Sequence, residues 1–245
     1  MNKLSRRSLI SYSLAAGAGL PALAPAAVEC TKSPGTPPAL EPERLLTDWP
    51  WLGRYREDNK KIIMLGPTSK VVFMGDSITE GWAASQPDFF SGGIVGRGIS
   101  AQTTPQMVLR MQADVVALHP RVVHIMAGTN DIASNTGPMT PEDTRNNIRA
   151  MTEIAKANGM KVVLASIPPA ANYPWRPGLE TAKTIMDMNS WISSYAKLVG
   201  ARYADYHSAM SNGKGGMKPG LSSDEVHPTA AGYAVMRPIA EAAIR

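Results

Sequence analysis

The sequence has only one cysteine, Cys30, among its 245 residues. A single thiol excludes a disulfide within the chain and any zinc module built on several cysteines. Charged residues make up 18% of the chain and aromatic residues 6%, whereas hydrophobic residues reach 44%. Such an apolar composition supplies a packed core and excludes an intrinsically disordered protein. No apolar run reaches the roughly 18 residues that a transmembrane helix needs, so the sequence predicts no stable membrane span.

A second set of absences concerns metals and cofactors. The sequence contains no HExxH motif, no GxxxxGK[ST] loop and no Cys/His pair at zinc spacing. These patterns hold a catalytic zinc ion or the phosphates of a nucleotide. The sequence therefore predicts a protein that uses no metal and no cofactor.

Positive charge is concentrated at the N-terminal end. The formal net charge is +5, from 25 lysines and arginines against 20 acidic residues. Three of these positive charges, on Lys3, Arg6 and Arg7, precede the first acidic residue, Glu29. The rest of the chain then carries +2, which is close to neutral and predicts no nucleic-acid partner.

The first 27 residues have the layout of an export signal. A basic start is followed by an Ala/Gly/Leu-rich stretch that ends near Val28, an order typical of a secretory signal peptide rather than a membrane anchor. The paired arginines in Ser5–Ile10 resemble a twin-arginine signal, and an ordinary Sec signal is the alternative. We expect residues 1–27 to be a twin-arginine signal peptide, residues 28–48 a Pro-rich linker and residues 49–245 one folded domain. Such a protein would be exported, to the periplasm or out of the cell.

Several short runs of apolar and β-branched residues predict strands. Their apolarity is continuous rather than alternating, which is typical of strands that are covered on both faces, as in a parallel sheet. The predicted strands are Lys70–Met74, Gly93–Ile99, Arg121–Met126, Met160–Ser166 and Ala201–Tyr206.

Helical patterns lie between these strands. Thr140 followed by Pro141 predicts a helix start, and Gly159 fits the end of that helix. Further helices are predicted over Thr104–Leu118, Leu179–Val199 and Thr229–Ile244. Strands interleaved with helices predict a three-layer, doubly wound α/β fold with a five-stranded parallel sheet and helices on both faces. Ligands of such folds bind at the carboxyl ends of the strands.

Two segments contain residue types suited to nucleophilic catalysis. Ser77 follows the first predicted strand, where a serine either caps the next helix or is exposed as a nucleophile. Asp224 stands three residues before His227, close enough to hold one imidazole nitrogen while the other takes a proton from a serine. The alternative for this second segment is a solvated loop.

Two further strand ends offer hydrogen-bond donors. Gly98 has no Cβ, so a ligand oxygen can approach its backbone N–H. Asn130 follows the third predicted strand and carries a neutral side-chain donor. Together with the N–H of Ser77, these groups would make a three-donor oxyanion hole, although each alone is ordinary turn chemistry. We expect Asp76 and Asp131 to brace the neighbouring loops.

These four segments resemble the defining blocks of the SGNH hydrolases, also called GDSL-type esterases and lipases. The matching segments are Gly75–Gly81 (GDSITEG), Gly96–Thr104 (GRGISAQTT), Gly128–Asp131 (GTND) and Asp224–Pro228 (DEVHP). The resemblance extends over residues 49–245. It implies a flavodoxin-like sheet and a carboxylic ester hydrolase that passes through an acyl-serine intermediate. In that family pattern Ser77, Asp224 and His227 form the catalytic triad, and Ser77, Gly98 and Asn130 form the oxyanion hole.

The sequence indicates the substrate class less narrowly than it indicates the catalytic residues. Tyr173 and Trp175 lie in a loop after the fourth predicted strand, where they either offer a wall to a sugar ring or acyl chain or pack on the domain. Export favours a small-molecule, carbohydrate or lipid ester as the partner, and the leading expectation is an O-acetyl group on carbohydrate. The alternatives are a lysophospholipase or lipase-like acylhydrolase, an O-acyltransferase that uses the same triad, and a non-catalytic carbohydrate-binding module.

Overall fold

The computed structural model describes residues 42–66 and 69–245. The signal peptide expected at residues 1–27 and residues 28–41 of the expected linker lie outside the described residues. Within the last part of that expected linker, α1 (Pro42–Thr47) is a short helix. Proline is well tolerated at the first position of a helix, where its missing N–H would have had no partner. The expected linker therefore includes a short helix in its described part.

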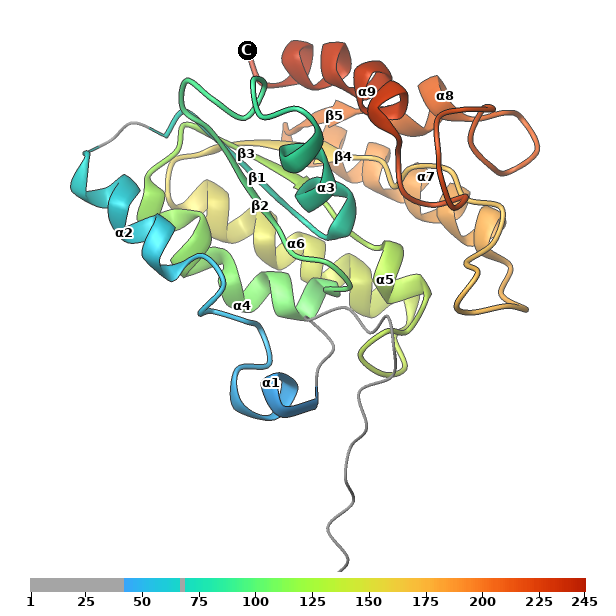
Figure 1. The fold of residues 1–245 in the computed structure, drawn as a ribbon, viewed down its shortest axis with the longest axis horizontal. Coiled ribbons are helices and arrows are strands. Elements are labelled where there is room, and N and C mark those ends of the chain that lie inside the picture. Colours follow the sequence, from blue (N-terminus) through green and yellow to red (C-terminus); the bar gives the residue numbers. More distant parts are fainter. Residues whose placement is uncertain (1–41, 67–68) are drawn as a thin grey trace, which may run out of the picture. The chain divides into compact units, whose positions relative to one another are not determined.

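The described residues contain five strands that form one parallel sheet. They are β1 (Val71–Gly75), β2 (Ile94–Gly98), β3 (Val122–Met126), β4 (Lys161–Ala165) and β5 (Arg202–Ala204). Their order across the sheet is β2-β1-β3-β4-β5, which can be followed in Figure 1. This is the doubly wound α/β fold that the sequence predicts.

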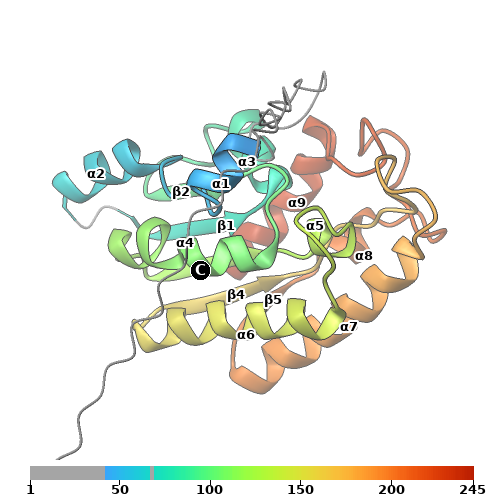
Figure 2. The ribbon, with the colours of Figure 1, turned by 90° about the horizontal axis from the view of Figure 1, so that it is seen from below.

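Helices cover both faces of the sheet (Figures 1 and 2). On one face lie α4 (Thr104–Asp114), α6 (Pro141–Ala157) and α7 (Thr181–Val199). On the other face lie α3 (Ser77–Ser85), α8 (Tyr206–Met210) and α9 (Ala230–Ala243). Two further helices, α2 (Arg56–Met64) and the short α5 (Thr129–Ile132), precede β1 and follow β3 respectively.

The two faces of each central strand belong to two separate hydrophobic clusters. In β1, Val72 and Met74 belong to the cluster that includes residues of α4, α6 and α7, whereas Val71 and Phe73 belong to the cluster that includes residues of α3 and α9. All four side chains are buried. A strand that is buried on both faces needs apolar residues at every position, which explains the continuous apolar runs in the sequence.

The predicted elements agree with the observed ones to within a few residues, with two further differences. The predicted strand Ala201–Tyr206 ends at Ala204, because Asp205 accepts a hydrogen bond from the N–H of Ser208 at 3.0 Å and so starts α8. The helix predicted to run to Leu118 ends at Asp114 and continues as a single 3-10 turn.

The strand order places three candidate residues at one edge of the sheet. The chain passes from β1 to β2 on one side and then to β3 on the other side of β1, which is a topological switch point. The strands are in register there, since Gly75 pairs with both Gly98 and Met126. The segments that follow β1, β2 and β3 therefore meet in one place, where such folds bind their ligands. Among the described residues, we find no helix with the length and apolarity required to traverse a bilayer.

Candidate active site

Ser77 is the first residue of α3 and directly follows the turn that leaves β1. Asp76 caps this helix, since its carboxylate accepts a hydrogen bond from the N–H of Ile78 at 3.0 Å. The first N–H groups of a helix have no partner within the helix, and the helix dipole favours negative charge beside them. The turn thus presents a hydroxyl group and a backbone donor at the same point.

His227 and Asp224 complete a hydrogen-bonded chain with Ser77. The Oγ atom of Ser77 lies 2.8 Å from Nε2 of His227, and Nδ1 of His227 lies 2.6 Å from Oδ2 of Asp224. A carboxylate only accepts, so we assign the ring proton to Nδ1, which leaves Nε2 to accept from the serine hydroxyl.

The loop that carries this pair folds back locally, as the three-residue spacing predicts. The Oδ1 atom of Asp224 accepts hydrogen bonds from the N–H groups of Val226 and His227, at 3.1 and 2.7 Å. Partial burial raises the pKa of Asp224, but these bonds and the His227 ring outweigh it and hold the pKa below its usual value. Asp224 therefore stays ionised beside His227, where it can stabilise an imidazolium ion.

Gly98 allows β2 to lie against the turn of Ser77. A Cβ atom at Gly98 would lie 2.2 Å from the nitrogen of Glu80 and 2.6 Å from the carbonyl oxygen of Asp76. Real Cβ atoms do not approach backbone this closely. The position therefore requires glycine for packing, in addition to any approach of a ligand to its N–H.

Asn130 lies in α5, just after β3, and is buried. Its Nδ2 donates to the carbonyl oxygen of Gln102 at 3.0 Å and lies 3.4 Å from Oδ2 of Asp76. Its Oδ1 accepts from Nδ2 of Asn135 at 2.7 Å. An amide nitrogen has two hydrogens, and the second has only the long contact to Asp76, so it can serve a developing oxyanion.

Comparison with known proteins decides the family. The model of the GDSL-like Lipase/Acylhydrolase family matches residues 73–235, a range that contains the triad and the three predicted oxyanion donors. The chain belongs to the GDSL-like lipase/acylhydrolase family. The protein is accordingly an esterase-type acylhydrolase, a carboxylic ester hydrolase.

Three relatives illustrate the similarity. A protein of Bacteroides fragilis NCTC 9343 described as an acylhydrolase is 42% identical; the match covers 80% of this chain and 97% of that one, with a TM-score of 0.76. Esterase TesA of Pseudomonas aeruginosa is 25% identical over 66% of this chain and 80% of its own. An acetylxylan esterase of Geobacillus stearothermophilus shares the fold at 22% identity, with a TM-score of 0.59 over 72% of this chain and 94% of its own.

In this acylhydrolase, the segment at the end of β2, which contains Gly98, is held in place by residues that the sequence does not point to. The hydroxyl of Tyr55 donates to the carbonyl oxygen of Gly98. Glu80 accepts from the N–H of Ser100 at 2.8 Å and forms an ion pair with Arg54 at 2.9 Å. Tyr55 and Arg54 precede the matched range, and no local pattern in the sequence connects them with Gly98.

The two predicted substrate-binding aromatics differ in exposure. Trp175 is 42% exposed, and its ring lies 6.5 Å from the His227 ring at an interplanar angle of 28°. Tyr173 is 0% exposed and stacks beneath Trp175, with ring centroids 5.2 Å apart. The expectation that Tyr173 offers a wall to the substrate is therefore wrong in this structure, because its ring is covered. Tyr173 instead supports Trp175 from the core side.

Two buried carboxyl groups flank the site, and both brace loops. Burial raises the pKa of Asp76 to about 6, against the opposing effects of the Ile78 N–H and of His227. Burial also raises the pKa of Asp131, whereas hydrogen bonds from Thr104 lower it. Asp131 accepts from the N–H of Thr104 at 3.0 Å and so joins the start of α4 to α5.

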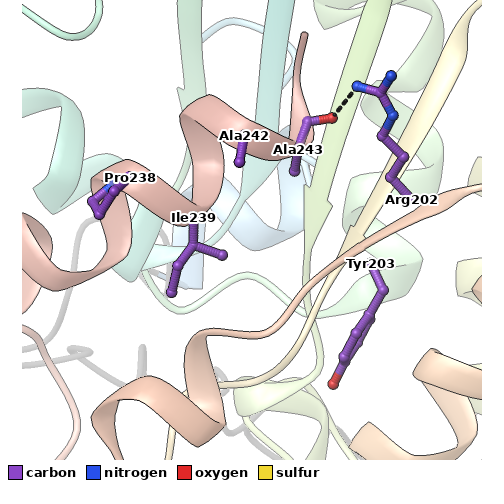
Figure 3. Close-up of a pocket in the computed structure, with 6 residues that line it drawn as sticks. All are labelled: Arg202, Tyr203, Pro238, Ile239, Ala242 and Ala243. Atoms are coloured by element: carbon purple, nitrogen blue, oxygen red, sulfur yellow. Dashed lines mark hydrogen bonds between the residues drawn. The ribbon is translucent and has the colours of Figure 1, made fainter.

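Two further features of the described residues concern other kinds of site. Within residues 42–66 and 69–245, no group of three or more His, Cys, Asp or Glu side chains is arranged to hold a metal ion. A large open hollow of about 600 Å³ lies between β5 and α9. Figure 3 shows its lining, where Arg202 donates to the carbonyl oxygen of Ala243 at 2.8 Å. Its lining residues include no nucleophile paired with a base.

Proposed function

We propose that this acylhydrolase is a serine esterase that cleaves short-chain carboxylic esters through an acyl-enzyme intermediate on Ser77. The observation that carries the proposal is the chain of hydrogen bonds from Ser77 through His227 to Asp224, at 2.8 and 2.6 Å. A nucleophile, a base within reach of it and an acid that orients the base are the parts that acyl transfer requires. A pure binding module needs none of them.

The mechanism follows from these positions. Ser77 Oγ attacks the ester carbonyl carbon as its proton passes to His227 Nε2, and the carbonyl oxygen becomes an oxyanion. The N–H groups of Ser77 and Gly98 and the amide of Asn130 stabilise that charge. The carbon–oxygen bond of the ester then breaks, and His227 gives its proton to the leaving alcohol. Water, activated by His227, hydrolyses the acyl-serine to release the acid and restore Ser77.

The surroundings of His227 favour an alcohol rich in hydroxyl groups. The leaving oxygen takes its proton from His227, so the alcohol must lie on the side of Ser77 where His227 is. Trp175 presents an exposed indole there, and flat aromatic faces suit sugar rings. A hollow of about 350 Å³, lined in part by Asn172, Ser223 and Glu225, borders the same loop.

O-acetylated carbohydrate is therefore the substrate class that we favour. The acetylxylan esterase of Geobacillus stearothermophilus has the same fold, which is compatible with this substrate class. Lysophospholipids and transfer of the acyl group to an alcohol acceptor are the other outcomes that the experiment below separates.

The experiment compares the purified protein with Ser77→Ala on p-nitrophenyl acetate, butyrate and octanoate, and on acetylated xylo-oligosaccharides. We expect turnover that falls with acyl length, releases acetate from the oligosaccharides and is absent in the variant. A maximum at octanoate would favour a lipid substrate. Partition of the product toward an added alcohol would indicate a transferase, and a folded protein without Ser77-dependent turnover would refute the esterase mechanism.

Export through the twin-arginine route is part of the same proposal. The support is the Ser5–Ile10 motif followed by the Ala/Gly/Leu-rich stretch. Changing Arg6 and Arg7 together to lysine should retain the precursor in the cytoplasm, as measured by fractionation. Unchanged export would indicate the Sec route.

A further inference from the structure

Two loops at the active site are joined by side chains that the mechanism above does not use. Asn135 follows α5, on the loop after β3, and Trp175 lies on the loop after β4. The Nε1 atom of Trp175 donates to Oδ1 of Asn135 at 3.0 Å, and Nδ2 of Asn135 donates to Oδ1 of Asn130 at 2.7 Å. A chain of hydrogen bonds thus runs from an exposed indole to the buried oxyanion donor.

The direction of this chain is set at both ends, since the carbonyl oxygen of Gln102 only accepts and so faces the nitrogen of the Asn130 amide. An indole N–H only donates, so it must face the oxygen of the Asn135 amide rather than the nitrogen. The nitrogen of Asn135 then faces Asn130 and requires an acceptor, which only the Oδ1 atom of Asn130 provides. The Asn130 amide is consequently held with its nitrogen toward Gln102 and toward Asp76, the residue that directly precedes Ser77. Reversing either amide would place an oxygen where a donor is needed.

We propose that Asn135 is a positioning residue for the oxyanion hole, and that the indole N–H of Trp175 orients the side-chain amide of Asn135. The inference rests on the proposed function, because Asn130 must act as an oxyanion donor for its orientation to matter. Hydrogen bonds in a chain also polarise one another, so the same arrangement strengthens the donor on Asn130.

The loop itself does not depend on the Asn135 side chain. Arg176 donates from Nε to the carbonyl oxygen of Ala133 at 2.9 Å and from Nη2 to that of Ser134 at 3.1 Å. The backbone N–H of Asn135 donates to the carbonyl oxygen of Asn130 at 3.0 Å. Replacing the side chain therefore leaves the two loops tied together, and the effect should fall on the amide of Asn130.

One consequence concerns the substrate. Trp175 borders His227 on the side where the alcohol departs, and its N–H begins the chain that ends at Asn130. An alcohol that packs on this indole restrains the ring, and through Asn135 it restrains the oxyanion donor. Trp175 thereby couples recognition of the leaving group to stabilisation of the transition state.

The test uses Asn135→Asp, Trp175→Phe and the exposed control Asn146→Ala on α6, each assayed on p-nitrophenyl acetate. Asp at position 135 still accepts from the indole but cannot donate to Asn130. Phe at position 175 keeps a ring but has no N–H. We expect Asn135→Asp to lower kcat by about 10-fold to 100-fold, because small misplacements of catalytic groups have effects of this size, with KM within about threefold of its original value.

Trp175→Phe should lower kcat by a smaller factor, about 3-fold to 10-fold, also without a large change in KM. The rate at which a p-nitrophenyl alkylphosphonate modifies Ser77, followed by mass spectrometry, should fall in parallel, because that reaction uses the same oxyanion hole. Thermal unfolding of both variants should stay close to that of the control.

The outcomes distinguish a failure of the role assigned to Asn135 from a failure of the proposed esterase activity. If the unmodified protein shows Ser77-dependent turnover while Asn135→Asp retains kcat within about twofold, Asn135 only braces the loops and the inference is wrong. A change of Asn135→Asp confined to KM would likewise overturn it and assign Asn135 to substrate contact. If the unmodified protein itself shows no Ser77-dependent turnover, the failure lies with the proposed function.

Discussion

Gly98→Ala is the substitution for which the structure makes the sharpest prediction. Gly98 ends β2 and pairs with Gly75 in β1. The added Cβ would lie 2.2 Å from the nitrogen of Glu80, 2.6 Å from the oxygen of Asp76 and 2.7 Å from the carbonyl carbon of Thr79. All three atoms are backbone, in the turn that carries Ser77. No rotation of a side chain can relieve the contact, so either β2 or the turn must move.

The size of the effect follows from the distances. Ordinary contacts of a Cβ begin near 3.4 Å, so the closest pair must separate by about 1.2 Å. Overpacking of this kind lowers stability by about 1–3 kcal/mol, or about 2–12 °C in Tm for a domain of this size. A misplacement of about 1 Å lowers turnover by about 10²-fold. We therefore expect a folded protein with kcat reduced about 100-fold.

The assay compares Gly98→Ala with Gly96→Ala in the same strand, using p-nitrophenyl acetate turnover and thermal unfolding. A Cβ at Gly96 would lie 2.9 Å from Cβ of Ala83 and 3.3 Å from Cδ1 of Phe90. The Cβ of Ala83 is fixed to the backbone of α3, but it needs only about 0.5 Å of movement and lies in the last turn of that helix, away from Ser77, so kcat should remain within a few fold. If Gly98→Ala folds and keeps the original kcat, the close approach of β2 to the Ser77 turn is not required for catalysis.

Three further predictions concern the polar groups of the site. Asn130→Ala should lower kcat by about 10²–10³ while the protein stays folded, because one oxyanion donor is lost; kcat near the original value would remove Asn130 from the mechanism. Asp224→Asn should lower kcat less than Ser77→Ala, since triad members contribute unequally, and equal losses in steady-state assays would contradict this. Asp76, with its pKa raised to about 6 by burial, binds a proton more tightly in the folded than in the unfolded state. Its contribution to stability is therefore present at acidic pH and is lost as the pH rises from about 4 to about 6, by at most about 3 kcal/mol. The free energy of unfolding, measured with denaturant, should fall between pH 4 and pH 7 in the unmodified protein and fall less in Asp76→Asn. An equal fall in the two proteins would refute this prediction.

Helices and strands that depend on residues close together in the chain can be predicted from the sequence. Thr140 caps α6 as expected, since its hydroxyl accepts from the N–H of Asp143 and the Asp143 carboxylate accepts from the N–H of Thr140. The buried runs of β1 and β3 needed only their apolarity to be recognised. The start of α8 was missed because Asp205 acts through a hydrogen bond that competes with strand extension.

The sequence by itself offered Ser77, Asp224 and His227 as candidates, with a helix cap and a solvated loop as the alternatives. Asp224 and His227 are three residues apart, so their contact is a property of a local turn, and Ser77 lies in a strand-to-helix turn with its own pattern. Tertiary structure alone decided that Tyr55 reaches the carbonyl oxygen of Gly98, that Tyr173 is covered while Trp175 is exposed, and that Asn135 lies between Trp175 and Asn130. The physical reason is that a hydrogen bond or a stacked ring depends on side-chain orientation across segments far apart in the chain, and composition and spacing carry no information about that orientation.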